Sequence, residues 1–413
     1  MKITHIHIER FRGFQNEDFE VGSQLTAIAG QNGTQKSTLL AIVTQTFTLK
    51  AEDPMRAEKP LCGGSYISAF KDKFRLSPTF DRPKGHEWTI SFDAGVDDFT
   101  VESIKRTGDP NVRFWKKGAR QEGDGYLSFP TIFLSLKRLV PMAEEAKIIT
   151  DDTLLTPEEL NEFKQLHNKI LIVQTPISSA TTITSKNKQS IGVSTELYDW
   201  NQNSMGQDNL GKIILALFSF KRLHDKYPRQ YKGGILAIDE MDATMYPASQ
   251  VELLRILRRY ASKLNLQILF TTHSMSLLKA MDDLVQEVNK KEETANQVKV
   301  LYLKKVDDKI AIKQGVNFKG IQLDLNVVAE GNNRKKNKIT VYTEDKENIL
   351  FVKAILKTKA SVLDFVDVTL PCSTLMELVT KRVPAFRYPY SIVILDGDVR
   401  TNRNDLKKSQ QCR

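Results

Sequence analysis

The stretch IAGQNGTQKSTLL at residues 28–40 constrains the fold more than any other part of the sequence, because it joins a strand pattern to a helix pattern through a glycine-containing loop. The apolar run LTAIAG predicts a buried strand, and KSTLLAIVTQTF has the apolar spacing of a helix. Backbone N–H groups of such a loop, with the first turn of a helix, form a cradle for phosphate oxygens. We therefore expect an α/β domain with a nucleotide site at the end of this strand.

The loop follows the pattern G-x-x-x-x-G-K-[ST] of phosphate-binding loops, except that Gln35 occupies the place of the second glycine. In this pattern Lys36 reaches the β- and γ-phosphates, and the Ser37 hydroxyl holds Mg²⁺. If the backbone at Gln35 has a positive φ angle, a side chain there costs on the order of 1 kcal/mol. That cost is small beside multidentate phosphate binding, so we expect ATP to bind, while the effect on hydrolysis stays open. The residues expected to bind nucleotide here are Gly30, Asn32, Gly33, Lys36, Ser37 and Thr38.

Three further segments that suit a nucleotide site follow in order. The strand pattern GGILAIDE ends in Asp239, expected to bind Mg²⁺ through water, and Glu240, expected to polarise the attacking water. A later strand ends in TTHS and places His273 where an imidazole can contact the γ-phosphate. Upstream, NSMGQ begins a helix that can donate hydrogen bonds to a phosphate. The residues concerned are Ser204, Gly206 and Gln207. The alternatives are an ordinary helix cap with a turn glycine at that helix start, and a core histidine at His273.

The pattern of strands and helices predicts the organisation of the rest of the chain. Residues 3–9 are expected to form an edge strand. Strand-like runs broken by Gly and Pro at residues 50–130 predict an antiparallel β lobe, and residues 140–200 are expected to be a helical insertion. Within that insertion, TPEELNEFKQLHNKIL has the N-cap, proline and glutamate of a helix start at Thr156, Pro157 and Glu159.

From about residue 204, short apolar strands alternate with helices, as in a parallel sheet covered by helices. The polar and basic stretch EGNNRKKNK then marks a domain boundary. We therefore expect a first domain at residues 1–330 and a second, smaller α/β domain at residues 338–413.

The second domain carries acidic residues at the ends of two predicted strands. Glu344 follows ITVYT, and YSIVILDGD ends in Asp396 and Asp398, which point to one side of an extended segment. Carboxylates at the C-terminal edge of a parallel sheet suit Mg²⁺ or Mn²⁺, which can activate water for phosphodiester cleavage. We expect these three residues to be metal ligands and catalytic residues, with Lys346 and Arg400 as weaker candidates for phosphate contacts. The alternative is a structural unit with surface acids.

Over roughly residues 1–320, four ordered motifs resemble the ABC-type ATPase head of the SMC/RecF and OLD (overcoming lysogenization defect) group. ITHIHIERFRGF resembles its first strand and turn, GQNGTQKST its phosphate loop, NSMGQ its S-x-G-Q signature, and LAIDEMDATMYP its D-E-P-E-x-x-L-H-P segment. The sequence departs from that pattern at Gln35, Met241 and Tyr246, and FLSLKR lies in the Q-loop region, with Arg138 a candidate phosphate or partner contact. The resemblance implies that Ser204 faces the ATP of a second copy, so that ATP brings two heads together.

The second domain resembles a TOPRIM domain, in which a strand-ending glutamate is followed later by D-x-D. A head followed by TOPRIM is the arrangement of OLD-type nucleases, which implies a DNA nuclease, often serving in defence against phage. Residues 399–413 are all that follow Asp398, so we expect a TOPRIM-like domain shortened at its C-terminus, in which cleavage by this chain alone is in doubt.

The resulting prediction is an ATPase, acting as a dimer or higher oligomer, that regulates metal-dependent DNA cleavage. One alternative is a regulatory ATPase scaffold that holds or releases a separate effector protein and has no nuclease activity. Another is a RecF-like DNA-gap binder, which gives no use for the D-G-D strand.

Composition agrees with a cytoplasmic protein that has a polyanionic partner. The formal net charge is +10, which is compatible with binding to DNA, a polyanion. No apolar run approaches the roughly 18 residues of a membrane span, and MKITHIHIER lacks the apolar core of a signal peptide. Cys62, Cys372 and Cys412 are few, odd in number and far apart, which indicates free thiols in a reducing compartment.

Overall fold

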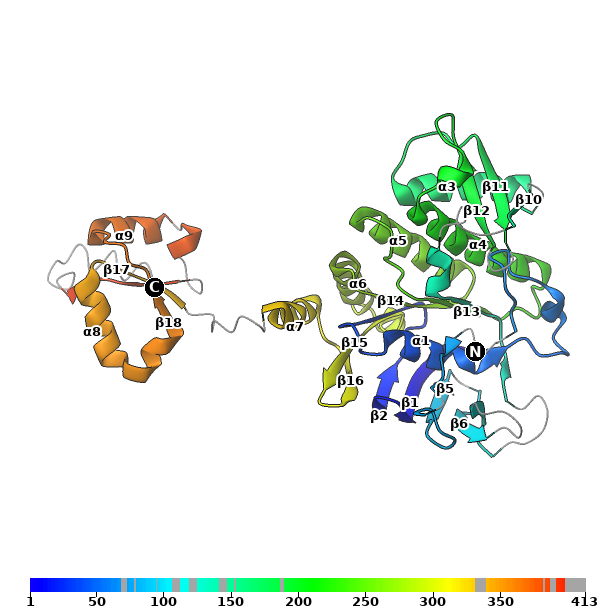
Figure 1. Cartoon of the computed structure of the whole chain (residues 1–413), viewed down its shortest axis with the longest axis horizontal. Coiled ribbons are helices and arrows are strands. Elements are labelled where there is room, and N and C mark those ends of the chain that lie inside the picture. Colours follow the sequence, from blue (N-terminus) through cyan, green and yellow to red (C-terminus); the bar gives the residue numbers. More distant parts are fainter. Residues whose placement is uncertain are drawn as a thin grey trace. The chain divides into compact units, whose positions relative to one another are not determined.

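The chain folds into two compact units, Met1–Leu323 and Asp324–Arg413 (Figure 1). The computed structural model describes residues 1–67, 73–77, 79–93, 95–105, 112–118, 125–140, 147–151, 154–185, 189–330, 339–381, 383–386 and 391–397. Among the helices in these ranges, none combines the length and the hydrophobicity that a transmembrane span requires.

A six-stranded sheet forms the centre of the first unit, in the order β16-β15-β3-β14-β13-β9. Its strands are β3 (Leu25–Gly30), β9 (Thr131–Leu134), β13 (Gly234–Ile238), β14 (Leu266–Thr272), β15 (Val298–Val306) and β16 (Lys309–Gln314). Neighbouring strands are parallel, except that β16 runs antiparallel to β15. Strands β3, β13 and β14 are buried along their whole length, as parallel strands covered on both faces should be. The predicted α/β fold is therefore confirmed.

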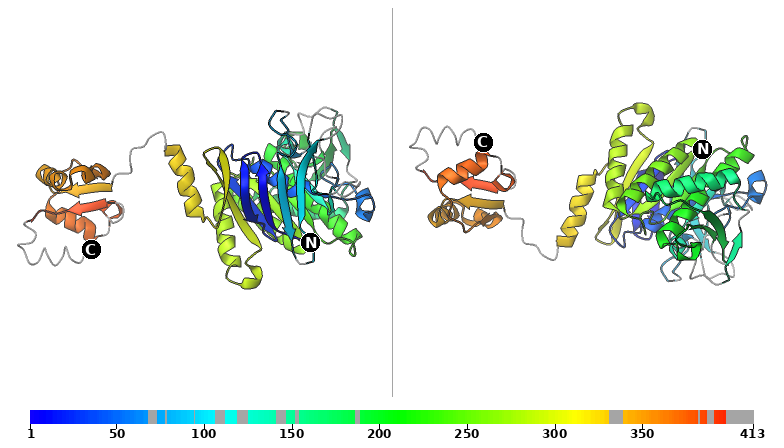
Figure 2. Two further views of the ribbon diagram at one scale, coloured as in Figure 1. Left: turned by 90° about the horizontal axis from the view of Figure 1, so that it is seen from below. Right: turned by 90° about the horizontal axis from the view of Figure 1, so that it is seen from above.

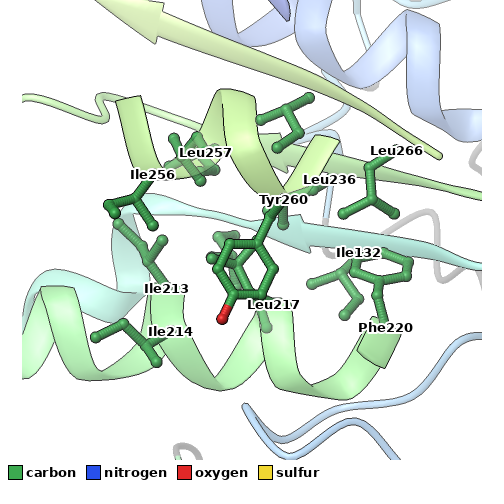
Figure 3. Close-up of a cluster of buried hydrophobic side chains, with 14 of the residues drawn as sticks. Ile132, Ile213, Ile214, Leu217, Phe220, Leu236, Ile256, Leu257, Tyr260 and Leu266 are labelled. Atoms are coloured by element: carbon green, nitrogen blue, oxygen red, sulfur yellow. The ribbon is translucent and has the colours of Figure 1, made fainter. Parts of the chain in front are cut away.

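Helices cover both faces of this sheet. The described helices that cover it include α1 (Lys36–Gln45), α3 (Pro157–Leu171), α4 (Met205–Lys226), α5 (Pro247–Lys263) and α6 (Met275–Val288). Alternate side chains of β13 enter different cores: Ile235 and Ala237 pack with α1, whereas Leu236 and Ile238 pack with α4 and α5. Figure 3 shows the core on the α4 and α5 side of the sheet, where Tyr260 of α5 lies among the aliphatic side chains of α4 and the sheet.

A five-stranded antiparallel sheet packs on the α1 side of the first unit, in the order β2-β1-β5-β6-β7 (Figure 2). Its strands are β1 (Ile3–Phe11), β2 (Phe14–Glu20), β5 (Glu87–Phe92), β6 (Phe99–Lys105) and β7 (Val112–Lys116). The prediction that residues 3–9 form an edge strand was wrong, because β1 lies between β2 and β5. The strand pairs with a segment about 80 residues later, a long-range contact that local sequence patterns do not show.

The insertion at residues 140–200 is only partly helical. Helix α3 begins with the predicted capping box: the Glu159 N–H donates to Thr156 Oγ1 (3.3 Å), and the Thr156 N–H donates to Glu159 Oε2 (3.0 Å). The remaining described residues include an antiparallel sheet of β10 (Ile149–Asp151), β11 (Ser179–Thr184) and β12 (Gln189–Ser194). The prediction of a helical insertion was therefore wrong for these strands, whose runs SATTIT and QSIGVS carry β-branched residues that favour extended backbone.

The second unit contains a small parallel sheet in the order β18-β17-β19. Its strands are β17 (Ile339–Thr343), β18 (Leu363–Phe365) and β19 (Ser391–Ile394), and its helices include α8 (Lys346–Leu356) and α9 (Cys372–Thr380). Helix α7 (Phe318–Glu330) precedes this sheet along the chain, and the short strands β4 (Phe47–Thr48) and β8 (Leu127–Ser128) pair in the first unit. Parallel strands need crossover connections, which α8 and α9 provide.

Candidate nucleotide and metal sites

Three loops meet at one edge of the six-stranded sheet. Strands β3, β14 and β13 are parallel neighbours, so the residues that follow them lie at the same edge. The loop at residues 31–35 follows β3, His273 follows β14, and Asp239 and Glu240 follow β13. The structure thus brings together the three segments that the sequence analysis assigned to one nucleotide.

The phosphate-loop lysine is buried at this edge. Lys36 Nζ donates hydrogen bonds to the carbonyl oxygens of Gly30 (3.1 Å) and Gln31 (2.8 Å). Burial lowers the pKa of Lys36, and the carboxylates that follow β13 partly oppose this effect. Gly33 has a φ of 80°, and no atom lies within 4 Å of where its Cβ would be, so the loop surface is open there. An ammonium group beside open loop backbone is suited to binding phosphate.

A hydroxyl and a carboxylate from distant segments form the second part of the site. Ser37 Oγ donates to Asp239 Oδ1 (2.9 Å), and Thr271 Oγ1 donates to the same oxygen (2.7 Å). The Glu240 N–H in turn donates to Thr271 Oγ1 (2.6 Å). Buried Asp242 Oδ1 has no hydrogen-bond partner among the described residues. This set of hard oxygen donors fits Mg²⁺.

Glu240 and His273 complete the edge. Glu240 has a left-handed backbone with φ of 49°. His273 is exposed, which excludes the alternative of a core histidine. Its backbone N–H donates a hydrogen bond to Asp242 Oδ2 (3.4 Å). Partial desolvation of its imidazole and the charge of Lys36 lower the pKa of His273, against the opposing effect of the nearby carboxylates. Its imidazole is therefore neutral at pH 7 and can exchange hydrogen bonds with a phosphate oxygen.

The residue that departs from the glycine pattern has the backbone that glycine favours. Gln35 has φ 61° and ψ 32°, so the condition of a positive φ is met at this position. Its side chain lies against the turn between β1 and β2, where the Gly13 N–H donates to Gln35 Oε1 (3.4 Å). A Cβ at Gly13 would lie 2.9 Å from Gln35 Nε2. Glycine at position 13 thus makes room for the glutamine.

The helix start at Ser204 has the geometry of a capping box. The Gln207 N–H donates to Ser204 Oγ (3.3 Å), and the Ser204 N–H donates to Gln207 Oε1 (2.8 Å). The ordinary helix cap is thus present, and Ser204 and Met205 are also exposed to solvent. Gly206 is buried, and a Cβ there would lie only 2.6 Å from the Thr244 carbonyl oxygen, so this close approach needs glycine. The start of α4 consequently packs against the turn that follows Asp239 and Glu240.

Arg138 does not face outward as a candidate for phosphate or partner contact would. It is 2% exposed and donates to Asn209 Oδ1 (2.7 Å) and to the Glu240 carbonyl oxygen (2.8 Å). Burial lowers its pKa to about 10, against the opposing charges of the nearby carboxylates. That prediction was wrong, because a charged residue after a buried strand can bind internal carbonyl groups instead of ligand.

Sequence analysis missed several residues that support the site. Thr271 and Asp242 lie inside the motifs TTHS and DEMD, where their hydrogen-bonding side chains were the only signal. Arg12, in the turn after β1, donates to Thr38 Oγ1 (3.4 Å) and forms two hydrogen bonds with the buried carboxylate of Asp81 (3.0 and 2.9 Å). Burial alone would raise the pKa of Asp81, but Arg12 and two other hydrogen bonds hold it at about 2. No sequence motif joins these residues.

In the second unit, two of the predicted acidic residues lie at one sheet edge. Thr343 of β17 pairs with Ile394 of β19, so Glu344 and Asp396 follow neighbouring parallel strands. Glu344 Oε1 accepts a hydrogen bond from the Cys372 N–H (3.3 Å) at the start of α9, and its buried Oε2 has no partner in the described part of the chain.

The rest of the predicted metal site is incomplete in the described residues. Asp396 Oδ1 accepts from the Gly397 N–H (2.6 Å), whereas Asp398 and Arg400 lie outside the described residues. Lys346 forms an exposed ion pair with Asp367 (3.1 Å). No group of three or more His, Cys, Asp or Glu side chains is arranged to hold a metal ion in the ranges that the structure describes.

Comparison with known proteins identifies an ATPase domain. Residues 135–278 match the AAA ATPase domain family, and this range contains Ser204, Asp239, Glu240 and His273. No curated protein matches the sequence. This part of the chain is therefore similar to an ATPase domain, and ATP with Mg²⁺ are the ligands that such domains use.

Solved structures similar to this chain include two SMC head domains and a recombination mediator protein. The SMC head domain from Thermotoga maritima is 14% identical, over 76% of this chain and 100% of that chain, with a TM-score of 0.41. The Smc head domain bound to the C-terminal domain of ScpA, from Pyrococcus furiosus, is 13% identical, over 79% and 99%, with a TM-score of 0.41. The recombination mediator protein RecF with ATP is 13% identical, over 76% and 98%, with a TM-score of 0.38.

Proposed function

We propose that the first unit binds ATP with Mg²⁺ at the sheet edge around Lys36 and hydrolyses it. The observation that carries this proposal is the hydrogen bond from Ser37 to Asp239 (2.9 Å), which joins residues 202 positions apart beside the buried Lys36. A phosphate loop and a strand-ending carboxylate that meet in this way supply the parts that nucleoside triphosphate hydrolysis needs. The match of residues 135–278 to an ATPase domain supports the same activity.

Each residue at this edge of the six-stranded sheet has its own role in the proposed reaction. Lys36 and the loop N–H groups bind the phosphates, and Ser37 with Asp239 would hold Mg²⁺. When bound, Mg²⁺ neutralises charge that develops on the phosphate oxygens. Glu240 orients the attacking water and accepts its proton, while neutral His273 donates a hydrogen bond to the terminal phosphate.

Phosphate release from ATP tests this assignment. Glu240→Gln should lower kcat by about 10²-fold or more, because a general base is lost while the side chain keeps its size. The matched control is Glu252→Gln on α5, whose carboxylate pairs with Lys169 and Arg255 away from the loop. Equal rates for the wild type and Glu240→Gln would remove the assignment.

For the second unit, we propose a metal-dependent site that cleaves DNA phosphodiester bonds, formed by Glu344, Asp396 and Asp398 and controlled by the nucleotide state of the first unit. The position of Glu344 and Asp396 after neighbouring parallel strands supports it, since the carboxyl ends of such strands gather metal ligands. The resemblance to OLD-type nucleases, often found in defence against phage, supports DNA as the substrate.

Nicking of supercoiled DNA with Mg²⁺ or Mn²⁺, with and without ATP, tests the cleavage site. Asp396→Ala should abolish cleavage and leave ATP binding intact. The control is Asp367→Ala, an exposed acid of the same unit that pairs only with Lys346 in the described structure. If Asp396→Ala cuts DNA as fast as the wild type does, the site is wrongly placed.

A second candidate function is a regulatory ATPase that holds or releases a separate effector protein. The hydrogen bond from the Cys372 N–H to Glu344 favours it, because a carboxylate in this place can serve only to stabilise the N-terminus of helix α9. This function predicts ATP hydrolysis, a stably co-purifying partner, and no nicking with either metal.

A further inference from the structure

We propose that Arg138 and Asn209 form a positioning pair that links the start of helix α4 to Glu240, so that hydrolysis depends on what the start of α4 contacts. The inference rests on the proposed ATP hydrolysis. It adds two buried residues to the machinery and a physical route by which a second copy at Ser204 affects Glu240.

The guanidinium of Arg138 joins three elements. Arg138 lies in the short 3-10 helix Leu136–Leu139, which follows β9. Its Nη1 donates to the carbonyl oxygens of Leu134 (3.3 Å) and Ser135 (3.1 Å) at the end of β9. Its Nε donates to Asn209 Oδ1 on α4, and its Nη2 donates to the Glu240 carbonyl oxygen after β13. A buried cation is costly unless its hydrogen bonds are satisfied, so this arrangement resists rearrangement.

Helix α4 contacts the same turn directly. Asn209 Nδ2 donates to the Ala243 carbonyl oxygen (3.0 Å), three residues after Glu240. Gly206 lies so close to the Thr244 carbonyl that a Cβ would be 2.6 Å from its oxygen. One amide side chain therefore binds Arg138 with its oxygen and the turn with its nitrogen. Movement of the N-terminal end of α4, where Asn209 lies in the second turn, therefore acts on both contacts.

The backbone at Glu240 depends on being held. Its φ of 49° lies in the left-handed region, which is unfavourable for a residue other than glycine. The Glu240 N–H is fixed by Thr271 Oγ1 (2.6 Å), and its carbonyl oxygen is fixed by Arg138 (2.8 Å). Anchors on both sides of one residue determine where its carboxylate points. Loss of the Arg138 anchor frees the carbonyl side and lets the carboxylate leave the orientation that activates water.

The two ends of this linkage have different functions. Ser204, at the exposed start of α4, is the residue that the resemblance to ABC-type heads places against a second copy, and Glu240 is the proposed base in its own copy. Because Arg138 and Asn209 connect them, contact with the second copy biases the Glu240 backbone. We infer that docking stimulates hydrolysis through this pair.

Steady-state ATPase kinetics of Arg138→Lys and Asn209→Ala test the inference. Lysine keeps the charge but does not span the oxygens that the guanidinium binds. Both variants should lower kcat by about tenfold or more while KM for ATP stays within about threefold, because positioning acts on the chemical step. The matched control is Arg222→Lys near the other end of α4, which removes a guanidinium bound to Glu159 of α3 and should leave kcat unchanged.

A second readout separates positioning from a merely structural role. The specific activity of the wild type should rise with protein concentration as copies dock. In Arg138→Lys, that rise should disappear although light scattering still detects docking. Unchanged kcat in a folded Arg138→Lys protein overturns the inference, and if that variant does not fold, an Asn209→Ala protein with wild-type kcat overturns it. A wild type that hydrolyses no ATP would instead overturn the proposed function itself.

Discussion

Gln35 shows how a single residue can depart from a phosphate-loop pattern and keep its geometry. Its φ of 61° is the conformation that glycine adopts freely, and its side chain contacts Gly13. Gln35→Gly removes about 1 kcal/mol of backbone strain but loses that contact and adds freedom to the unfolded chain. We expect the free energy of unfolding to change by less than about 1 kcal/mol, with ATP affinity unchanged.

The matched variant Gln35→Val should behave differently. A β-branched side chain is disfavoured in the left-handed region, so we expect a loss of about 1–2 kcal/mol in unfolding free energy and weaker ATP binding. Chemical denaturation and nucleotide titration of both variants measure these effects. A valine variant as stable as the wild type would show that the loop relaxes out of this conformation.

The neutral imidazole of His273 predicts the pH dependence of hydrolysis. Burial and Lys36 lower the pKa of His273 below its ordinary value of 6.5, so the neutral form is present at pH 7 and above. We expect kcat to be constant on lowering the pH from 8 to about 7 and to fall only once the pH is below about 6.5. In His273→Gln that acidic decrease should vanish, whereas a wild-type profile that falls already between pH 8 and 7 would contradict the protonation state.

Contacts between residues of recognised motifs could be predicted from the sequence, whereas contacts that arise only from packing could not. Ser37 and Asp239 each stand in a pattern with a known chemical role, so their meeting follows from the order of the strands. Arg138 and Asn209 meet across the core, where neither neighbouring sequence carries a signal. Which oxygen a buried guanidinium binds is decided by tertiary packing.

At the scale of elements, two helices with the same cap offer a controlled comparison. Helix α3 begins with the capping box of Thr156 and Glu159, and α4 begins with that of Ser204 and Gln207. Removing either hydroxyl should cost about 1 kcal/mol of stability. Ser204→Ala should also reduce ATP-dependent docking of two copies, measured by light scattering, whereas Thr156→Ala should not. Equal docking in both variants would leave Ser204 with a structural role alone.

Elements with strong local signals were predicted well. The capping residues, proline and apolar spacing of α3 are all local, and the structure confirms them. The strands at 179–184 and 189–194 were missed although β-branched residues there favour extended backbone, because a three-stranded sheet also depends on pairing between segments. The same reason explains β1, whose position between β2 and β5 depends on a partner far along the chain.

At the scale of the whole molecule, sequence indicates two α/β units but not the point where they separate. The polar, basic stretch at 330–338 is the predicted boundary, and its residues 331–338 lie outside the described residues. The compact units divide between Leu323 and Asp324, within α7. A helix that continues through such a boundary carries no break in its periodicity. The domain limits from sequence stay predictions.

Binding of ATP with Mg²⁺ to four proteins tests the central claim most directly: the wild type, Lys36→Ala, Asp239→Ala and the double variant, all measured by titration calorimetry. If the phosphate loop and the strand-ending acid act on one nucleotide, each single variant should weaken binding at least about tenfold, and the double variant should lose much less than the sum of the two free-energy changes. Losses that add fully, or a Lys36→Ala protein that binds ATP as tightly as the wild type, would contradict a single shared site.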